Sequence, residues 1–263
     1  MTDTALIKKP TAAELVVAWE QASAIIDAAY KELDRAKTIL DAAYGKESYF
    51  DVIPHHNDGV ERMCKENVKR AWRRIIDMLE IRKVMSIARM EELDKNLNDG
   101  KMPEITLDNI LSISQGLVDS APEYAAEAVL EVFEFLRPGA SDHNQYKTNE
   151  KYARFELGKK VIITRACEMW SRQVWHVSHW RMDKIRAVDR VFHLVDGAGE
   201  LKGYNGPLID AIQTSQDRGG TGETAYFHFK VYANGNLHLD FKRPDLVQKL
   251  NQIAGNRTHL RGK

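Results

Sequence analysis

A dense group of aromatic and cationic residues lies between Trp170 and Arg181, where three of the five tryptophans of the chain occur. Indole rings beside guanidinium groups suit a nucleic acid, because bases stack on flat rings while cations neutralise phosphates. On an exposed strand, alternate residues would present Arg172, His176 and Trp180 on one face. A core in which the arginines cover buried tryptophans explains the same pattern equally well.

Cations elsewhere in the C-terminal half would extend this surface if the fold brought them together. The predicted nucleic-acid-binding residues are Arg172, Trp175, His176, Trp180, Arg181, Lys184, Arg186, Lys230, Lys242, Arg243 and Lys249. Lysine and arginine contacts to phosphates would make binding depend on salt without giving sequence specificity. DNA and RNA are both open as the partner.

The acidic residues of the same half allow a different chemistry. Asp240 and Lys242 lie two residues apart on a predicted strand and therefore on one face, and Asp196 or Asp210 could supply a second carboxylate. Two carboxylates could hold magnesium while the lysine stabilises charge that develops at a phosphate. A strand with its apolar residues inward and these side chains in solvent accounts for the same spacing. A metal-dependent nuclease is therefore the alternative hypothesis.

Two weaker patterns occur within the aromatic group. His176 and His179 could bind zinc with Cys167 or Glu168, but no further pair of ligands follows at the spacing of a zinc site. Arg172 and His179 have the spacing of some helical ribonucleases, although their flanks favour a strand. The two cysteines form no CxxC and are expected to be buried thiols. No metal and no cofactor is predicted, and whether the chain is an enzyme is left open.

Charge divides the chain into halves of opposite sign. The 263 residues carry no net charge, yet residues 1–135 hold 17 Lys/Arg against 25 Asp/Glu, which is −8, and residues 136–263 hold 21 against 13, which is +8. This asymmetry favours an anionic partner for the basic half, or docking of one half on the other. Neither a membrane span nor a signal peptide is found, so a cytoplasmic protein without membrane contact is expected.

Helical periodicity dominates the acidic half. Residues 15–43 contain apolar positions at alternating spacings of four and three, and a homodimer or packing within the chain could use this seam: Leu15, Trp19, Ala22, Ile26, Ala29, Leu33, Ala36, Leu40 and Ala43. A second helix is expected from Val60 to about Leu93. Thr106 should cap the next helix, and a capping box at Ser120 with a proline in the first turn should open another.

In the basic half, the spacing of apolar residues changes from helical to mixed helix and strand. A β-hairpin is expected from Phe155 to Thr164, and a second one over residues 225–241 around the turn Ala-Asn-Gly-Asn. Helices are expected from Met182 to Val195, from Pro207 to Ile212, and from Pro244 to a stop at Gly255. The glycine-rich stretch from Arg218 to Thr224 lacks the GK[ST] of a phosphate-binding loop and is expected to be a mobile connection.

Together these patterns predict an α+β protein. An N-terminal long-helix bundle or coiled-coil-like hairpin is followed by a small mixed α/β domain with antiparallel hairpins. The expected boundaries are 1–139 for the helical domain, 140–152 for a polar linker, 153–255 for the basic domain and 256–263 for a tail.

Several phrases follow one another along the chain in a recognisable order: ENVKRAWRRIIDMLEIRKVMSIARMEELDKNLNDGKMPEITLDNI, FEFLRP, KTNEKYARFELGKKVIITR, DRVFHLVDG and ANGNLHLDFKRPDLVQKLNQIAG. They resemble the bacterial and phage proteins grouped as domain of unknown function family 4942, and the resemblance covers about four fifths of the chain. This family has no agreed activity. Its members occur on plasmids, prophages and integrative elements, sometimes attached to adenosylmethionine-dependent DNA methyltransferase domains.

The resemblance implies an accessory protein in DNA modification, defence or counter-defence, with a DNA methyltransferase or a defence-system protein as a candidate partner. This chain is not itself such a methyltransferase, because it has no glycine-rich cofactor loop after a strand and no NPPY-like motif. The leading hypothesis is a nucleic-acid-associated protein of a phage or mobile genetic element. Besides the nuclease, a protein-binding adaptor assembled through the N-terminal helices is the other alternative.

Overall fold

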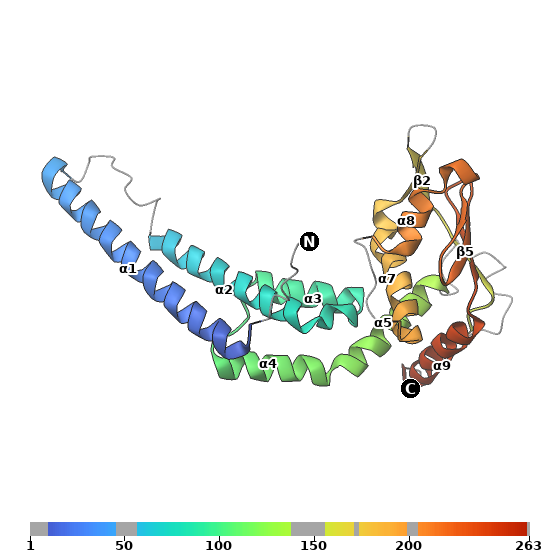
Figure 1. Ribbon diagram of the computed structural model, residues 1–263, viewed down its shortest axis with the longest axis horizontal. Coiled ribbons are helices and arrows are strands. Elements are labelled where there is room, and N and C mark those ends of the chain that lie inside the picture. The colour runs from blue at the N-terminus through green and yellow to red at the C-terminus, as the bar shows by residue number, and fades with distance from the viewer. Residues whose placement is uncertain (1–9, 46–56, 138–155, 171–173, 199–204, 262–263) are drawn as a thin grey trace, which may run out of the picture. The chain divides into compact units, whose positions relative to one another are not determined.

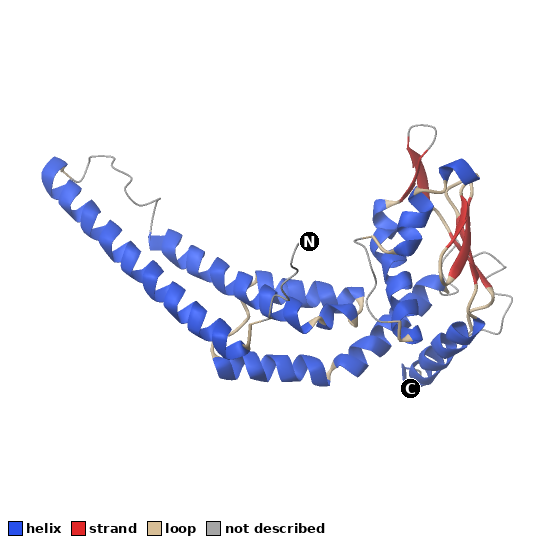
Figure 2. Cartoon of the chain, in the orientation of Figure 1, coloured by secondary structure: helices blue, strands red, loops and turns tan. Residues whose placement is uncertain are grey.

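A computed structural model describes residues 10–45, 57–137, 156–170, 174–198 and 205–261 (Figure 1). The described chain is mixed helix and sheet with antiparallel hairpins, which confirms that coarse part of the predicted fold class (Figure 2). It divides into two compact units, Met1–Arg82 with Glu92–Asp119 and Lys83–Glu91 with Ser120–Lys263. The predicted linker 140–152 lies outside the described residues, and the predicted domain boundaries stay predictions.

The first unit is helical. Its elements are α1 (Ala12–Tyr44), α2 (Asn57–Leu79), the larger part of α3 (Ile87–Asn98), and α4 (Leu107–Asp119). Thr11 and Glu14 form a reciprocal capping box at the start of α1. The side chain of Trp72 is fully buried, and its Nε1 donates a hydrogen bond to the carbonyl oxygen of Pro103 at 2.8 Å. As predicted, Thr106 caps α4 by accepting a hydrogen bond from the backbone N–H of Asn109.

The predicted long helix at residues 12–44 is present, but none of its residues is fully buried. The large residues of the predicted seam, such as Trp19 and Ile26, are half-buried. Helix α1 packs against α4, and the hydroxyl of Tyr30 lies 3.7 Å from the Sδ of Met63 on α2. The large residues of the seam therefore lie on the side from which α1 contacts its own unit, whereas its alanines at positions 22, 29 and 43 are exposed.

The expectation of one helix from Val60 to Leu93 is wrong. Helix α2 ends at Leu79, the 3₁₀ turn η1 (Ile81–Lys83) follows, and α3 begins at Ile87. Glu80 has a positive φ of 56°, which a right-handed helix cannot contain. Ser86 then accepts a hydrogen bond from the backbone N–H of Arg89 and so provides a new helix start.

The second unit is built on a four-stranded antiparallel sheet with the order β1-β6-β5-β4. Its strands are β1 (Lys160–Ile163), β4 (Thr221–Glu223), β5 (Phe227–Val231) and β6 (Leu237–Phe241). Burial alternates along β5 and β6, so one face of the sheet is apolar and the other is polar. The helices α5 (Ala121–Leu136), α7 (His179–Asp196), α8 (Pro207–Gln213) and α9 (Pro244–Arg261) contribute to the same core as this apolar face.

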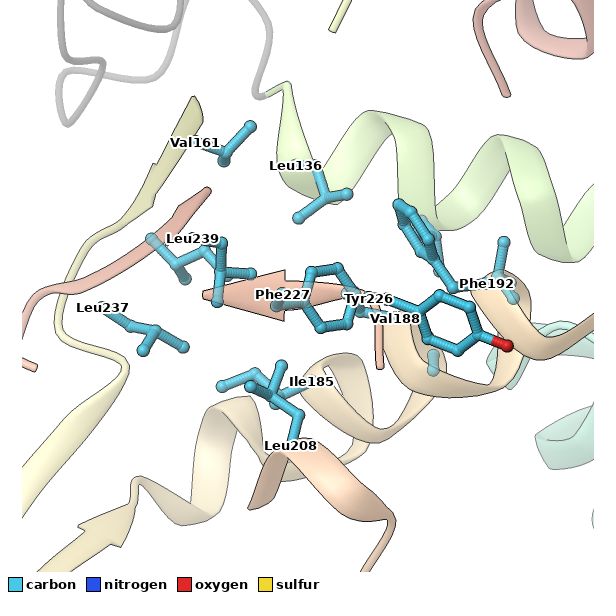
Figure 3. Packing of buried hydrophobic residues seen from close by; sticks show 14 of the residues in the cluster. Leu136, Val161, Ile185, Val188, Phe192, Leu208, Tyr226, Phe227, Leu237 and Leu239 are labelled. Atoms are coloured by element: carbon cyan, nitrogen blue, oxygen red, sulfur yellow. The ribbon is translucent and has the colours of Figure 1, made fainter. Parts of the chain in front are cut away.

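Aromatic rings occupy the centre of this core (Figure 3). The ring of Phe192 on α7 is stacked on that of Phe241, with centroids 5.5 Å apart, and meets Phe227 edge-on at 4.8 Å. Leu136 of α5 and Ile185 of α7 are also fully buried in this cluster. Helix α5, which was predicted as part of the N-terminal domain, therefore belongs to the core of the second unit.

The predicted hairpin between Phe155 and Thr164 is wrong within the described residues, which begin at residue 156. Leu157 is not in a strand, and β1 instead pairs with β6 in the register Val161 to Leu239. The side chain of Asn251 fixes Leu157 by accepting from its backbone N–H at 2.7 Å and donating to its carbonyl oxygen. Residues Thr221–Glu223, expected as a mobile connection, form the edge strand β4.

Two helix ends also differ from expectation. Ser120 has helical backbone angles and makes no side-chain capping bond, so the predicted capping box is wrong although the proline does lie in the first turn of α5. Helix α9 continues to Arg261, beyond the expected stop at Gly255. Thr214 and Gly197 end α8 and α7 close to the positions predicted from their periodicity.

The β5–β6 hairpin is confirmed, and its turn requires glycine. Gly235 has a φ of 81°, and a Cβ at this position would lie 2.4 Å from the backbone oxygen of Cys167. The backbone N–H of Cys167 also donates to the oxygen of Gly235 at 2.9 Å, so the turn is held against β2 (Cys167–Trp170).

We expect Gly235→Ala to lower the free energy of unfolding by about 2 to 4 kcal/mol, since it adds both backbone strain and a backbone clash. Gly255→Ala is the matched control, because it lies within α9 with no atom near its Cβ and should stabilise by up to about 1 kcal/mol. Urea unfolding of both variants measures the difference, and equal stabilities would contradict the account of the turn.

Candidate nucleic-acid interface

The start of α7 carries the most exposed large hydrophobic side chain among the described residues. Strand β3 (Val174–Val177) leads into α7 through Ser178, which makes no side-chain bond to the first turn. Trp180 follows with 86% of its surface exposed, and its ring meets that of His179 edge-on at 5.9 Å. Trp180 is thus on a helix, and not on the exposed strand that was predicted for it.

Two cations lie within one turn of this tryptophan. Lys184 follows Trp180 by four residues and Arg181 by three. Residues at these spacings are neighbours on a helix surface, so the three side chains lie together at the start of α7. The guanidinium of Arg181 and the ammonium of Lys184 lie 5.8 Å and 5.6 Å from the ring centre of Phe135 on α5. We call Trp180, Arg181 and Lys184 the α7 cationic site.

A cleft of about 290 Å³ adjoins this site. Its walls come from α5, β1 and α7, together with Ile87 of α3. We call it the α5–α7 cleft; its lining residues are Ile87, Glu131, Val132, Glu134, Phe135, Ile162, Ile163, Thr164, Arg181, Lys184 and Ala187. Apolar side chains, two cations and two carboxylates therefore face one small space. Glu131 also accepts a hydrogen bond from the backbone N–H of Ile87 at 2.6 Å.

The other predicted cations lie on β5, on α9 and at the start of α9, each with its own surroundings. Lys230 is exposed on β5, where its ammonium lies 5.0 Å from the ring centre of Tyr232. Lys249 is exposed on α9. Arg243 is bound by Asp196 at 2.9 Å and by Asp245 at 2.7 Å, and these bonds raise the pKa of its guanidinium.

The β2–β3 hairpin and α7 hold three further residues that were predicted to bind nucleic acid, and none of them is fully exposed. Trp175 is 7% exposed and belongs to the core, so its ring offers no free face to a base. His176 is half-buried opposite Glu168. Arg186 of α7 forms an ion pair with Asp183 at 2.7 Å. Arg172 lies outside the described residues.

The proposed nuclease pair has other partners. Asp240 lies 3.4 Å from the ammonium of Lys160 on the neighbouring strand. Lys242 bonds Glu223 at 3.2 Å and the backbone oxygen of Thr224 at 2.9 Å, and it is the first cause of the lowered pKa of Glu223. These contacts describe a strand whose polar side chains are paired across the outer face of a sheet.

The two carboxylates considered as the second metal ligand have different surroundings. Asp196 accepts hydrogen bonds from the hydroxyl of Tyr226 at 3.1 Å and from Arg243, whereas Asp210 is exposed on α8. Burial, followed by the bond to Asp196, raises the pKa of Tyr226 to about 12. Among the residues that the structure describes, no group of three or more His, Cys, Asp or Glu side chains could hold a metal ion.

Both cysteines are free, and Cys167 is buried as expected while Cys64 is half-buried. Burial is the main reason that the pKa of the Cys167 thiol is raised to about 12. The suggested zinc site at His176 and His179 gains no support from the described residues, because they contain no group of three or more possible metal ligands.

Sequence reasoning missed one titratable residue in the core. Asp189 of α7 is fully buried, and one of its oxygens accepts a hydrogen bond from the backbone N–H of Leu208 at 2.6 Å. Its other oxygen, Oδ1, has no hydrogen-bond partner. Loss of solvation is the main cause that raises the pKa of Asp189 to about 7, and the carboxylate of Asp210 adds to it. The only sequence signal was an aspartate on the apolar side of a predicted helix.

The fold and the site define the chain as a two-unit α+β protein with a cationic, aromatic helix start. A family model described as a domain of unknown function, DUF4942, matches residues 65–259, and the chain therefore belongs to this family. No curated protein and no solved structure matches the chain. None of the helices in the described ranges combines the length and apolar character needed to cross a bilayer.

The buried carboxyl group predicts a pH dependence of stability. An unfolded aspartate ionises near pH 4, whereas folded Asp189 holds its proton to about pH 7. The folded state therefore binds the proton more tightly between these values, and this group lowers the free energy of unfolding as the pH rises through that window.

We expect Asp189→Asn to keep the acceptor for Leu208 and to remove this dependence, so that the variant exceeds the unmodified protein in stability at pH 8 by about 1 to 4 kcal/mol. At pH 4 the two should be similar. Urea unfolding at both pH values tests this, with the exposed Asp217→Asn as control. An Asp189→Asn variant that is less stable at pH 8 would overturn the interpretation.

Proposed function

We propose that this protein is a nucleic-acid-binding accessory protein whose second unit contacts DNA or RNA through the α7 cationic site. The observation that carries the proposal is the 86% exposure of Trp180 beside Arg181 and Lys184. A tryptophan side chain left in water offers a large flat apolar surface to a partner. A nucleobase provides the flat face, and its phosphate provides charge for the cations.

Three further features support an anionic partner at this position. The C-terminal half of the chain has an excess of eight positive charges, as counted above. The site lies in the first turns of an 18-residue helix, where the helix dipole favours a phosphate. Arg181 supplies a planar guanidinium, which binds phosphate oxygens in pairs.

The accessory role rests on the family. The members of the family that occur on mobile elements suggest DNA modification, defence or counter-defence in a phage or mobile genetic element, with a DNA methyltransferase or a defence-system protein as partner. We also propose a cytoplasmic location, where such a partner would be met.

The first test is fluorescence anisotropy with labelled single- and double-stranded DNA and RNA at two salt concentrations. We expect salt-sensitive binding that weakens by about tenfold in Arg181→Gln/Lys184→Gln, with the salt slope lowered by about two because two phosphate contacts are lost. Lys95→Gln, an exposed lysine of α3, is the matched control. Unchanged affinity in the double variant would exclude the α7 cationic site.

The same titration repeated with magnesium separates binding from cleavage. Cleavage that depends on magnesium and disappears in Asp240→Asn would establish the nuclease alternative instead. The pairing of Asp240 with Lys160 and of Lys242 with Glu223 favours the outcome without cleavage.

Self-association through α1 is a second proposal, and a specific pattern favours it. Helix α1 carries a second series at spacings of four and three, which shares four alanines with the seam and is exposed except at Ala36: Ala18, Ala22, Ile25, Ala29, Glu32, Ala36, Ile39 and Ala43. Ile25 is 70% exposed and Ile39 is 66% exposed, and each lies seven residues from Glu32. In an antiparallel pair with its two-fold axis at Glu32, Ile25 of one copy would face Ile39 of the other.

This arrangement would match charge as well as shape. Arg35 bonds both oxygens of Glu32, at 2.9 and 3.0 Å, so the two glutamates that meet at the axis would bring their own counter-charges. Alanine at every seventh position lets the helix axes approach closely. The adaptor alternative would use the same surface with a different protein.

We expect Ile25→Glu/Ile39→Glu to weaken dimerisation by at least tenfold, because four isoleucine side chains would leave the interface. Val17→Glu is the matched control, since Val17 is exposed on α1 but lies outside this series. Analytical ultracentrifugation over a concentration range provides the measurement. A monomer at every concentration would rule out self-association.

A further inference from the structure

We infer that the α5–α7 cleft binds one unstacked nucleotide, so that the ligand of the second unit is single-stranded nucleic acid. This inference rests on the proposed function, because it concerns the same helix start. It goes further by naming the strand state of the ligand and the place of one base.

The cleft and the exposed tryptophan share a helix end. Arg181 and Lys184 line the cleft, and Trp180 is adjacent to the first and one turn before the second. A strand that places one base on Trp180 and its phosphate on these cations would therefore bring the neighbouring nucleotide to the mouth of the cleft. Bases within a duplex are paired and stacked on each other, so neither contact is open to them.

The composition of the lining suits a base better than a phosphate chain. Val132 and Ile163 supply an apolar wall, and the ring of Phe135 borders the same space with Arg181 and Lys184 over it. A base that stacks on this ring would take the place of these two side chains. Glu131 and Glu134 present carboxylates to the same space, and carboxylates repel phosphates but accept hydrogen bonds from the N–H groups of a base edge. The cations and carboxylates therefore favour a ligand that carries negative charge at one end and hydrogen-bond donors at the other.

The size of the cleft limits the ligand. A space of about 290 Å³ is at the lower end of ligand sites, which are roughly 300 to 1,000 Å³. One nucleotide is a group of suitable size, whereas a longer segment of strand has to run along the surface outside. The remaining nucleotides would then be held by charge and by Trp180.

Phe135→Leu in the full-length protein is the decisive variant, because it removes the flat ring and keeps an apolar side chain. We expect the unmodified protein to bind a labelled oligodeoxynucleotide strand about tenfold more tightly than the corresponding duplex or an abasic strand of equal length. Phe135→Leu should weaken binding of the base-containing strand by about tenfold, the effect of one stacked base, and leave duplex binding unchanged.

Two further variants exclude a general loss of structure. Tyr124→Leu is the matched control, since Tyr124 is on the same helix with Arg89 over its ring at 5.7 Å but does not line the cleft. Glu134→Gln keeps the shape of the cleft and should change the relative affinities for homopolymeric strands that differ only in their base. Thermal melting confirms that each variant is folded.

The outcomes distinguish the two proposals. Equal affinity for strand, duplex and abasic strand, with no effect of Phe135→Leu, would overturn the single-nucleotide site and leave nucleic-acid binding at the α7 cationic site intact. Absence of binding to every probe at low salt would overturn both.

Discussion

Burial of the apolar face of one antiparallel sheet is the constraint on which the rest of the second unit depends. The sheet has only one such face, and the helices that cover it bring α5 and α7 into the same core. Phe192 is central to that core, because it contacts aromatic residues of both β5 and β6. With α7 fixed by its buried side, its first turn is presented outward, which is where Trp180 lies.

This constraint explains why local periodicity located some elements well and others badly. The β5–β6 hairpin was predictable because alternation and an Asn-Gly turn are both local signals, and the turn geometry at Gly235 agrees with them. Strand β1 was assigned the wrong neighbour because its partner, β6, is about eighty residues away in the sequence. Pairing over that distance is decided by which face needs to be buried, and no short-range pattern encodes it.

The candidate site was predictable by residue type but not by grouping. Trp175 and Trp180 occur in the same sequence patch, yet one is in the core and the other is in solvent. The difference arises because a strand ends and a helix begins between them at Ser178, which changes the direction of each side chain. Phe135 and Glu134 were not predicted at all, since their closeness to Arg181 comes from the packing of α5 on α7. A contribution of α5 to this core could not be seen from its own amphipathic pattern.

The chain passes between its two units three times, after Arg82, after Glu91 and after Asp119. The short segment Lys83–Glu91 is held in the second unit by two contacts with α5. The backbone N–H of Ile87 donates a hydrogen bond to Glu131, and the side chain of Arg89 donates one to Glu127. No single cut therefore separates the two units from each other, and a gene fragment starting at residue 120 would lack part of the second one. Recombination that exchanges contiguous stretches of DNA therefore cannot transfer one unit without part of the other.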